Sequence, residues 1–223
     1  MPRQSKDQVL YDMHNHCVNL NLRDIYLHSY YIKDDVDEPG VDYRQATTFI
    51  KNLHMLDTPP YKPILVHLQS TGGDWDNGMA MFNAIQFASS YVTMLAYSQA
   101  SSMSGVVFQA APLRVMMPDC HFMMHYGWGG GGSNHPYAIK SEAEFGVVAC
   151  KRMLEIFAER AVKGQFFKQK KSTTVQSVYN FFDKKLREQI DWYLDSEETV
   201  YYGLADDILG SKDYPDIRSL REV

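Results

Sequence analysis

The sequence predicts an α/β fold built on a largely parallel sheet. Two apolar runs, 64–69 and 91–97, are short and rich in branched and aromatic residues, as buried strands are. A turn of small residues and then an apolar helical stretch follow each run. Because parallel strands must be joined by a crossover, this alternation of strand and helix indicates βαβ units.

The remaining elements follow in chain order from hydrophobic pattern and turn residues. Residues 1–23 are polar with a weak pattern, and the acidic stretch 33–43 contains a Pro-Gly break that is typical of a loop. The other expected elements are a strand at 24–31, helices at 44–56, 79–89 and up to 111, strands at 114–117 and 121–125, and helices at 138–163 and 175–193. Glycines at 127–133 form a loop, and 164–174 is a basic break between the last two helices.

Composition narrows the class of protein. Of the 223 residues, 45% are hydrophobic and 22% are charged, which is ordinary for a globular protein. The 22 basic and 27 acidic residues leave a net charge of −5, so nucleic acid and anionic membranes are poor candidates as partners. Three cysteines without a CxxC pair favour a reducing compartment. With no signal-peptide pattern and no apolar run of membrane-spanning length, we expect a cytoplasmic protein.

Candidate catalytic groups follow the two predicted parallel strands. Gly72-Gly73 and Ser101-Ser102-Met103 would lie beyond the carboxyl ends of these strands, where open α/β sheets collect functional groups. A serine in the first turn of a helix lies among unpaired backbone N–H groups, which suits a nucleophile and an oxyanion site together. The alternative is a helix N-cap beside a plain glycine turn.

A nucleophilic serine also needs a base and a carboxylate that orients the base. His125 ends a predicted strand directly before the glycine loop, and His121 shares its face through the strand period of two, so both are candidates. The carboxylates available for the third position are Asp191, Asp195, Asp206 and Asp207. Their spacing alone does not choose between them.

Four motifs, taken in chain order, are each similar to a motif of one known family. Gln69-Ser-Thr-Gly-Gly73 is similar to the family's Asn-Ser-Pro-Gly-Gly turn, and Gln99-Ala-Ser-Ser-Met103 is similar to the run that holds its nucleophile. Pro118-Asp-Cys-His-Phe-Met-Met-His125 matches the run that ends in the base. The segment from Asp191 to Asp206 resembles the one whose first Asp completes the triad. Together the four motifs resemble those of the proteolytic subunit of the ATP-dependent Clp protease (ClpP family).

This resemblance implies a fold, an activity and an assembly. The expected fold is a ClpP/crotonase-like repeated ββα spiral in a single domain, 1–223, with an N-terminal segment at 1–23 and a protruding helical handle at about 126–190. Carried over by residue, Ser102 is the nucleophile, His125 the base and Asp191 the orienting acid of a serine endopeptidase. The backbone N–H groups of Gly73 and Met103 would bind the oxyanion. The backbone of an extended substrate would lie along Gly72, Gly129 and Gly130.

The resemblance also implies partners. The family encloses its sites in two stacked heptameric rings, a tetradecamer, and the stripe formed by Ala143, Val147, Val148 and Leu154 would suit the contact between rings. No metal or cofactor is expected. The chain has no Walker A motif, so ATP would be used only by a separate AAA+ ATPase that unfolds polypeptide substrates. A divergent member could also lie in a plastid stroma or a phage-infected cell.

The departures from the family pattern leave rivals open. Thr71 replaces Pro in the glycine turn, Ser101 and Ser104 replace Ala and Gly beside the nucleophile, and Tyr126-Gly127 follows the base. Ser104 would put a side chain where the family has only hydrogen, so a tighter pocket is expected. An inactive ring subunit, a phage capsid-maturation protease on the same fold, and a crotonase-like acyl-CoA enzyme are the alternatives.

Overall fold

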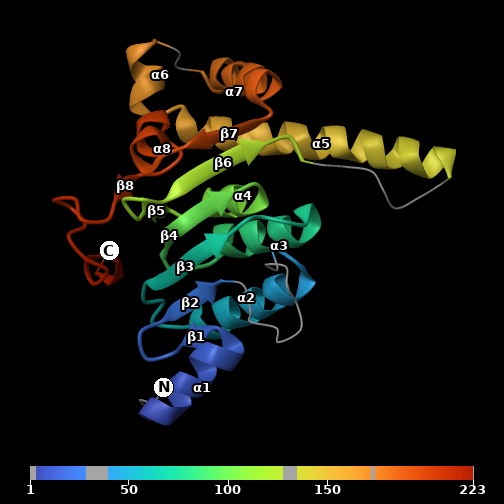
Figure 1. Ribbon diagram of the computed structural model, residues 1–223. Coiled ribbons are helices and arrows are strands. Elements are labelled where there is room, and N and C mark those ends of the chain that lie inside the picture. The colour runs from blue at the N-terminus through green and yellow to red at the C-terminus, as the bar shows by residue number, and fades with distance from the viewer. Residues whose placement is uncertain (1–3, 29–39, 128–134, 172–173, 223) are drawn as a thin grey trace.

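The computed structural model describes residues 4–28, 40–127, 135–171 and 174–222. Within them lies an eight-stranded sheet whose main path runs β1-β2-β3-β4-β5-β8, with β6 beside β4 and β7 beside β6 (Figure 1). The strands are β1 (Val18–Asn19), β2 (Asp24–Leu27), β3 (Ile64–Ser70), β4 (Val92–Ser101), β5 (Leu113–Met116), β6 (His121–His125), β7 (Asp191–Leu194) and β8 (Asp207–Ile208). Only the pairs β1–β2 and β6–β7 are antiparallel, so the expected parallel sheet is confirmed.

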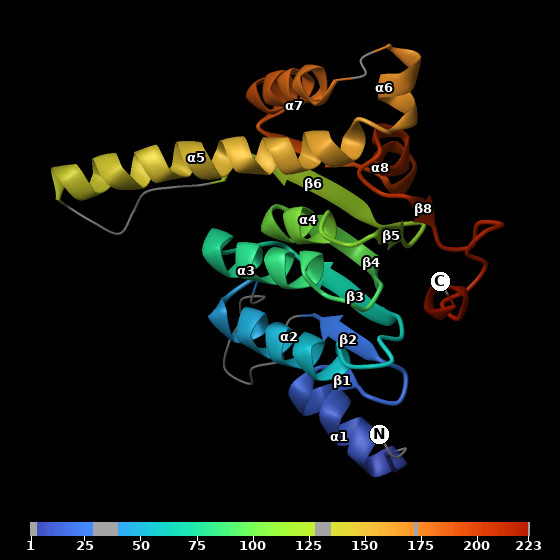
Figure 2. The same ribbon diagram turned by 180° about the vertical axis from the view of Figure 1, so that it is seen from behind.

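Helices cover one face of this sheet and extend past both of its ends (Figures 1 and 2). They are α1 (Lys6–His16), α2 (Tyr43–Leu56), α3 (Trp75–Gln86), α4 (Met103–Phe108), α5 (Pro136–Ala161), α6 (Gln165–Gln169), α7 (Val175–Gln189) and α8 (Ser196–Tyr202), and a 3₁₀ turn spans Ser219–Arg221. Figure 2 shows α2, α3 and α4 stacked side by side over the strands, and α5 reaching well beyond them with α6 and α7 alongside. The crossover helices therefore cover the sheet as βαβ units require.

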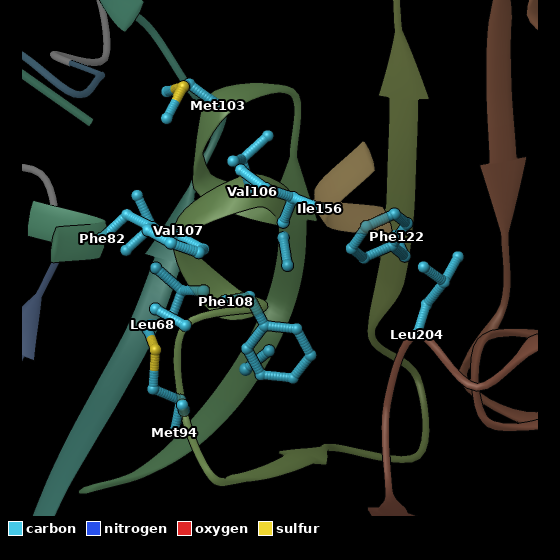
Figure 3. Packing of buried hydrophobic residues seen from close by; sticks show 14 of the residues in the cluster. Leu68, Phe82, Met94, Met103, Val106, Val107, Phe108, Phe122, Ile156 and Leu204 are labelled. Carbon is cyan, nitrogen blue, oxygen red and sulfur yellow. The ribbon is translucent and has the colours of Figure 1, made fainter. Parts of the chain in front are cut away.

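The main core fills the space between these helices and the sheet. Figure 3 shows Leu68, Val107 and Phe122 pointing into the same interior, and all three are almost completely buried. On the opposite face a smaller cluster joins Leu65 and Leu95 to Leu220 of the C-terminal segment. Both faces of the central strands are thus covered, which explains why their sequences are continuous apolar runs.

The long strand β4 pairs with different neighbours along its length. Its first half lies beside β5, from Thr93 opposite Leu113, while its last residues lie beside β6, from Gln99 opposite His121. The expected strand at 91–97 was therefore too short. The small residues 98–101, read from the sequence as a turn, continue the strand because β6 supplies hydrogen-bond partners for them.

Local capping explains two further differences from the expected elements. The helix expected from residue 79 begins at Trp75, because the Asp74 side chain accepts a hydrogen bond from the Asn77 N–H at 2.8 Å and caps it. The polar segment 1–23, expected to have little structure, contains α1, whose first turn the Ser5 hydroxyl caps through the Gln8 N–H. Capping by short polar side chains, and not apolar periodicity, therefore determines where these two helices begin.

The helix expected at 175–193 ends at Gln189. Ile190 follows with φ of 61°, an outlier for a β-branched residue, and the chain then turns into strand β7. Antiparallel pairing with β6 decides this outcome, since it buries Trp192 and Leu194 against the core while Tyr193 stays exposed. Tertiary pairing overrides the helical pattern of the sequence here.

Candidate functional site

Ser102 occupies the junction between β4 and α4. Its backbone lies at φ of 54° and ψ of −126°, a conformation that a residue with a side chain adopts rarely, and its N–H donates to the carbonyl of Met123 at 2.8 Å. This sharp turn from strand to helix directs the hydroxyl toward β6. Strained backbone of this kind is concentrated at functional sites.

Strand register brings the histidine to the serine. Parallel pairing sets Ser101 opposite Met123, so His125, two residues further along β6, reaches the Ser102 side chain. The Ser102 Oγ lies 2.6 Å from Nε2 of His125, whose side chain is only 11% exposed. His121 lies at the other end of β6, and its ring faces Tyr193 with 5.7 Å between centroids. Of the two candidate bases, the structure brings His125 to the serine.

Asp191 is the carboxylate that meets the histidine. It is the first residue of β7, directly opposite His125 in the antiparallel ladder, and its Oδ1 lies 3.1 Å from the His125 Nδ1. The other candidates have other partners: Asp195 caps α8, Asp206 pairs with Arg114 at 2.6 Å, and Asp207 accepts from Ser211. The Asp191 side chain is 43% exposed, which sets it apart from the nearly buried histidine.

The glycine turn after β3 lies against the serine. Gly72 has φ of 100°, and a Cβ on it would stand 2.6 Å from the Ser102 Cβ and 2.8 Å from the Met103 nitrogen. Gly73 has φ of 145° and approaches Val41 equally closely. Only residues without a side chain allow the two segments to come this close, so the glycine pair is required by the site's packing.

Ser104 supports the turn rather than narrowing the pocket. Its hydroxyl donates to the carbonyls of Ser70 and Ser101, each at 2.7 Å, and the residue is fully buried. These two carbonyls belong to the last residues of strands β3 and β4. The expectation of a tighter pocket was wrong, because on a short helix the side chain two positions after Ser102 points back into the core.

A pocket of about 510 Å³ opens beside the serine and the histidine. One wall comes from the glycine turn and α3, through Gly73, Asp74 and Trp75, and a second comes from α4. The opposite wall belongs to the α5 residues Glu142, Phe145, Gly146, Ala149, Cys150 and Met153. Gly127 also lines it, while Gly129 and Gly130 lie outside the described residues. A largely apolar pocket with few polar groups is typical of ligand sites.

Two residues at this site were not predicted from the sequence. Val41 pins the glycine turn, since its N–H donates to the Gly72 carbonyl and its own carbonyl accepts from the Asp74 N–H at 2.8 Å. Phe145 of α5 lines the pocket although it is 52% exposed overall. Phe145 could have been identified from the sequence, because it is an aromatic residue in a polar part of α5. No local sequence feature identifies Val41 as part of the site.

No group of three or more His, Cys, Asp or Glu side chains that could hold a metal ion occurs in the part of the chain that the structure describes. Within those same residues, no helix combines the length and the apolar character needed to cross a lipid bilayer.

Comparisons with known proteins identify the family of this chain. A family model described as Clp protease matches residues 36–212. The ATP-dependent Clp protease proteolytic subunit 2 of Pseudomonas aeruginosa is 28% identical over 178 residues, 78% of this chain and 79% of that protein. The corresponding subunit of Streptococcus suis is 25% identical over 173 residues, 76% of this chain and 80% of that protein.

The fold agrees as well. A ClpP1 variant from Listeria monocytogenes superimposes with a TM-score of 0.67 at 17% identity, covering 90% of this chain and 96% of that one. This likeness confirms the ClpP-like α/β fold expected from the motifs. The family model spans well over half of the sequence, and the chain therefore belongs to the Clp protease family.

Proposed function

We propose that this chain is a serine endopeptidase whose catalytic residues are Ser102, His125 and Asp191. The observation that carries the proposal is the continuous contact from hydroxyl to imidazole to carboxylate, at 2.6 Å and 3.1 Å. A serine, a base within hydrogen-bond reach and a carboxylate that orients the base are what acyl transfer requires. A simple N-cap role for Ser102 is disfavoured, because its hydroxyl caps no backbone N–H of α4.

The reaction proceeds through an acyl-enzyme. Ser102 Oγ attacks the peptide carbonyl while His125 Nε2 takes its proton, and Asp191 holds the imidazole by its Nδ1 and stabilises the imidazolium. His125 then gives the proton to the leaving amine. Water, activated by the same histidine, hydrolyses the ester and frees Ser102. The scheme uses no metal and no cofactor.

The backbone N–H groups of Gly73 and Met103 are the proposed oxyanion donors. The close approach of Gly72 to the Met103 nitrogen supports this, because it brings the two segments to one point beside the nucleophile. Met103 is also the first residue of α4, where backbone N–H groups have no partner within the helix. Losing one such donor typically costs about 10²–10³ in rate.

The substrate is a polypeptide bound in extended form. Gly72, Gly129 and Gly130 are proposed to lie along its backbone. The apolar pocket would take one side chain next to the scissile bond. Main-chain pairing of this kind gives affinity with little sequence specificity. The net charge of −5 disfavours nucleic acid and anionic membranes as partners.

Members of the Clp protease family form ring oligomers and in general work with an ATPase partner. We extend this to the present chain as stacked heptameric rings in the cytoplasm, fed by an AAA+ ATPase that alone uses ATP. Val147 and Val148 on the projecting part of α5 are 56% and 61% exposed, which suits the proposed contact between rings. Leu154 is buried within the chain, so it was wrongly assigned to that contact.

Replacing the nucleophile tests the assignment. Ser102→Ala is expected to abolish hydrolysis of a fluorogenic peptide and labelling by a fluorophosphonate, with the oligomer unchanged by mass photometry. Ser101→Ala is the matched control, because that neighbouring hydroxyl contacts Gln99 and not the histidine. Undiminished turnover in Ser102→Ala would refute the mechanism. Wild-type protein that forms rings but neither labels nor hydrolyses would indicate the inactive structural subunit instead.

A further inference from the structure

A short hydrogen-bonded bridge joins the residue after the histidine to α7. The hydroxyl of Tyr126 donates to Oδ1 of Asp183 on that helix. Arg187, one turn further along, donates to both oxygens of the same carboxylate, from Nε at 3.0 Å and from Nη2 at 3.1 Å. Its guanidinium also lies 5.9 Å from the centre of the Tyr126 ring. We call these three residues the Tyr126 clamp.

The clamp spans the two elements that bring His125 and Asp191 together. Tyr126 directly follows His125 at the end of β6, and α7 runs through Ile190 straight into Asp191 at the start of β7. The clamp therefore links the end of β6, next to the proposed base, to the helix that leads into the proposed carboxylate. In Figure 1, β7 lies between α7 above it and β6 below it.

Asp191 needs such support more than His125 does. In the described part of the chain, β7 pairs only with β6, and Asp191 is its first residue. The preceding Ile190 holds a positive φ of 61°, which is unfavourable for a β-branched residue, and the Asp191 side chain is 43% exposed. A strand end next to strained backbone has few local restraints on its side chain. Trp192 anchors the following position through Phe182, with 6.1 Å between ring centres.

At neutral pH, the protonation states of Asp183 and Tyr126 favour the hydrogen bonds of the clamp. Hydrogen bonds from Arg187, and then from Tyr126, lower the pKa of Asp183 below its usual value, so the carboxylate is charged and accepts strongly. Burial, followed by the bond to Asp183, raises the pKa of Tyr126, so its hydroxyl keeps the proton that it donates. Hydrogen bonds to a charged acceptor are about twice as strong as neutral ones.

We propose that Tyr126 and Asp183 are positioning residues, which hold the Asp191 carboxylate against the His125 imidazole. The inference rests on the proposed serine-peptidase function. Breaking the clamp would leave substrate binding intact, since none of its three residues lines the pocket beside Ser102. It would instead lower the fraction of molecules in which His125 is correctly oriented, and so lower kcat.

The test compares two tyrosines that lose only a hydroxyl. Tyr126→Phe is expected to lower kcat about tenfold and to slow fluorophosphonate labelling of Ser102 to a similar extent, with KM within about twofold of wild type. Tyr179→Phe is the matched control on α7. Burial and then the charge of Asp183 raise the pKa of Tyr179, so its hydroxyl is close to the clamp, yet no hydrogen bond from it to that carboxylate is found among the described residues. Asp183→Asn keeps an acceptor for Tyr126 but loses the charge, so it should fall between Tyr126→Phe and wild type.

The outcomes separate this inference from the function on which it rests. A wild-type enzyme that hydrolyses peptide, together with a Tyr126→Phe variant whose kcat equals that of Tyr179→Phe, would overturn the clamp alone. A rise in KM with unchanged kcat would also overturn it. Failure of the wild type to label at Ser102 would overturn the proposed function itself. Ring size and thermal midpoint are measured for each variant, and a loss of kcat matched by ring dissociation counts against positioning.

Discussion

Replacing Gly72 by alanine tests how closely the glycine turn and the nucleophile are packed. The new Cβ would stand 2.6 Å from the Ser102 Cβ and 2.7 Å from the Ser101 carbonyl oxygen, so about 0.8 Å of movement is needed to restore an ordinary contact of 3.4 Å. The neighbours are backbone or adjacent to it and cannot rotate away. A displacement of about 1 Å at reacting groups costs about a hundredfold in rate.

The same substitution also strains its own backbone. At φ of 100°, an alanine costs about 1–2 kcal/mol relative to glycine. For a chain of this size, a loss of about 2 kcal/mol lowers the thermal midpoint by about 4–8 °C. We therefore expect Gly72→Ala to fold, to unfold at a lower temperature, and to retain about 1% of the wild-type kcat toward a fluorogenic peptide.

Gly127→Ala is the control for this experiment. Gly127 lines the same pocket, but a Cβ there would meet nothing within 4 Å, so kcat is expected to stay within about twofold of wild type. Both variants are assayed at a temperature well below the lower midpoint, which separates misplacement from unfolding. If Gly72→Ala kept half of the wild-type kcat, the close approach inferred from the turn would be refuted.

Three further predictions concern burial and charge. Arg221→Ala removes the guanidinium that lies 2.6 Å from the fully buried Asp24 carboxylate and leaves it only the His67 imidazole at 3.2 Å, so the free energy of unfolding should fall by about 3 kcal/mol; an unchanged urea midpoint would contradict this. Burial raises the pKa of Cys120 to about 12, so iodoacetamide at pH 8 should modify the half-buried Cys150 but reach Cys120 only after unfolding, as mass spectrometry can show. Because the pKa of Asp183 is lowered in the folded state, its stabilisation is complete above pH about 4 and is lost as pH falls through the lower folded-state value; the thermal midpoints of wild type and Asp183→Asn should converge as the pH is lowered through that value.

The location of the proposed nucleophile and base was predictable because the features that place them are local, whereas the choice of Ser102 over Ser101 came from the family resemblance. Small residues around Ser102 indicate a tight junction, and the strand β6 ends at His125, two residues before Gly127. Parallel strands present their carboxyl ends at one edge of the sheet, so the two residues had to lie near each other. The structure adds the register, Ser101 opposite Met123, which selects His125 over His121.

The carboxylate was not predictable from pattern, and only the family resemblance singled it out. The residues before Asp191 form an amphipathic helix, and the apolar residues after it extend that pattern, so the sequence predicted one helix through 193. The strand β7 exists because β6 offers an unpaired edge, and that edge is formed about 70 residues earlier in the chain. Pairing over such a separation leaves no signal within a local window.

The same reasoning explains why the departures from the family pattern around the site were hard to interpret. Ser104 looked like an obstruction of the pocket, yet it bonds the ends of β3 and β4 and so fixes the turn that holds Ser102. Tyr126 looked like a simple replacement after the base, yet it reaches Asp183 on a helix more than 50 residues away. In both cases a polar side chain has found partners from another segment, which is what a buried or half-buried polar group requires. A substitution beside a catalytic residue is therefore better judged by where its hydrogen bonds end than by its distance from that residue in the sequence.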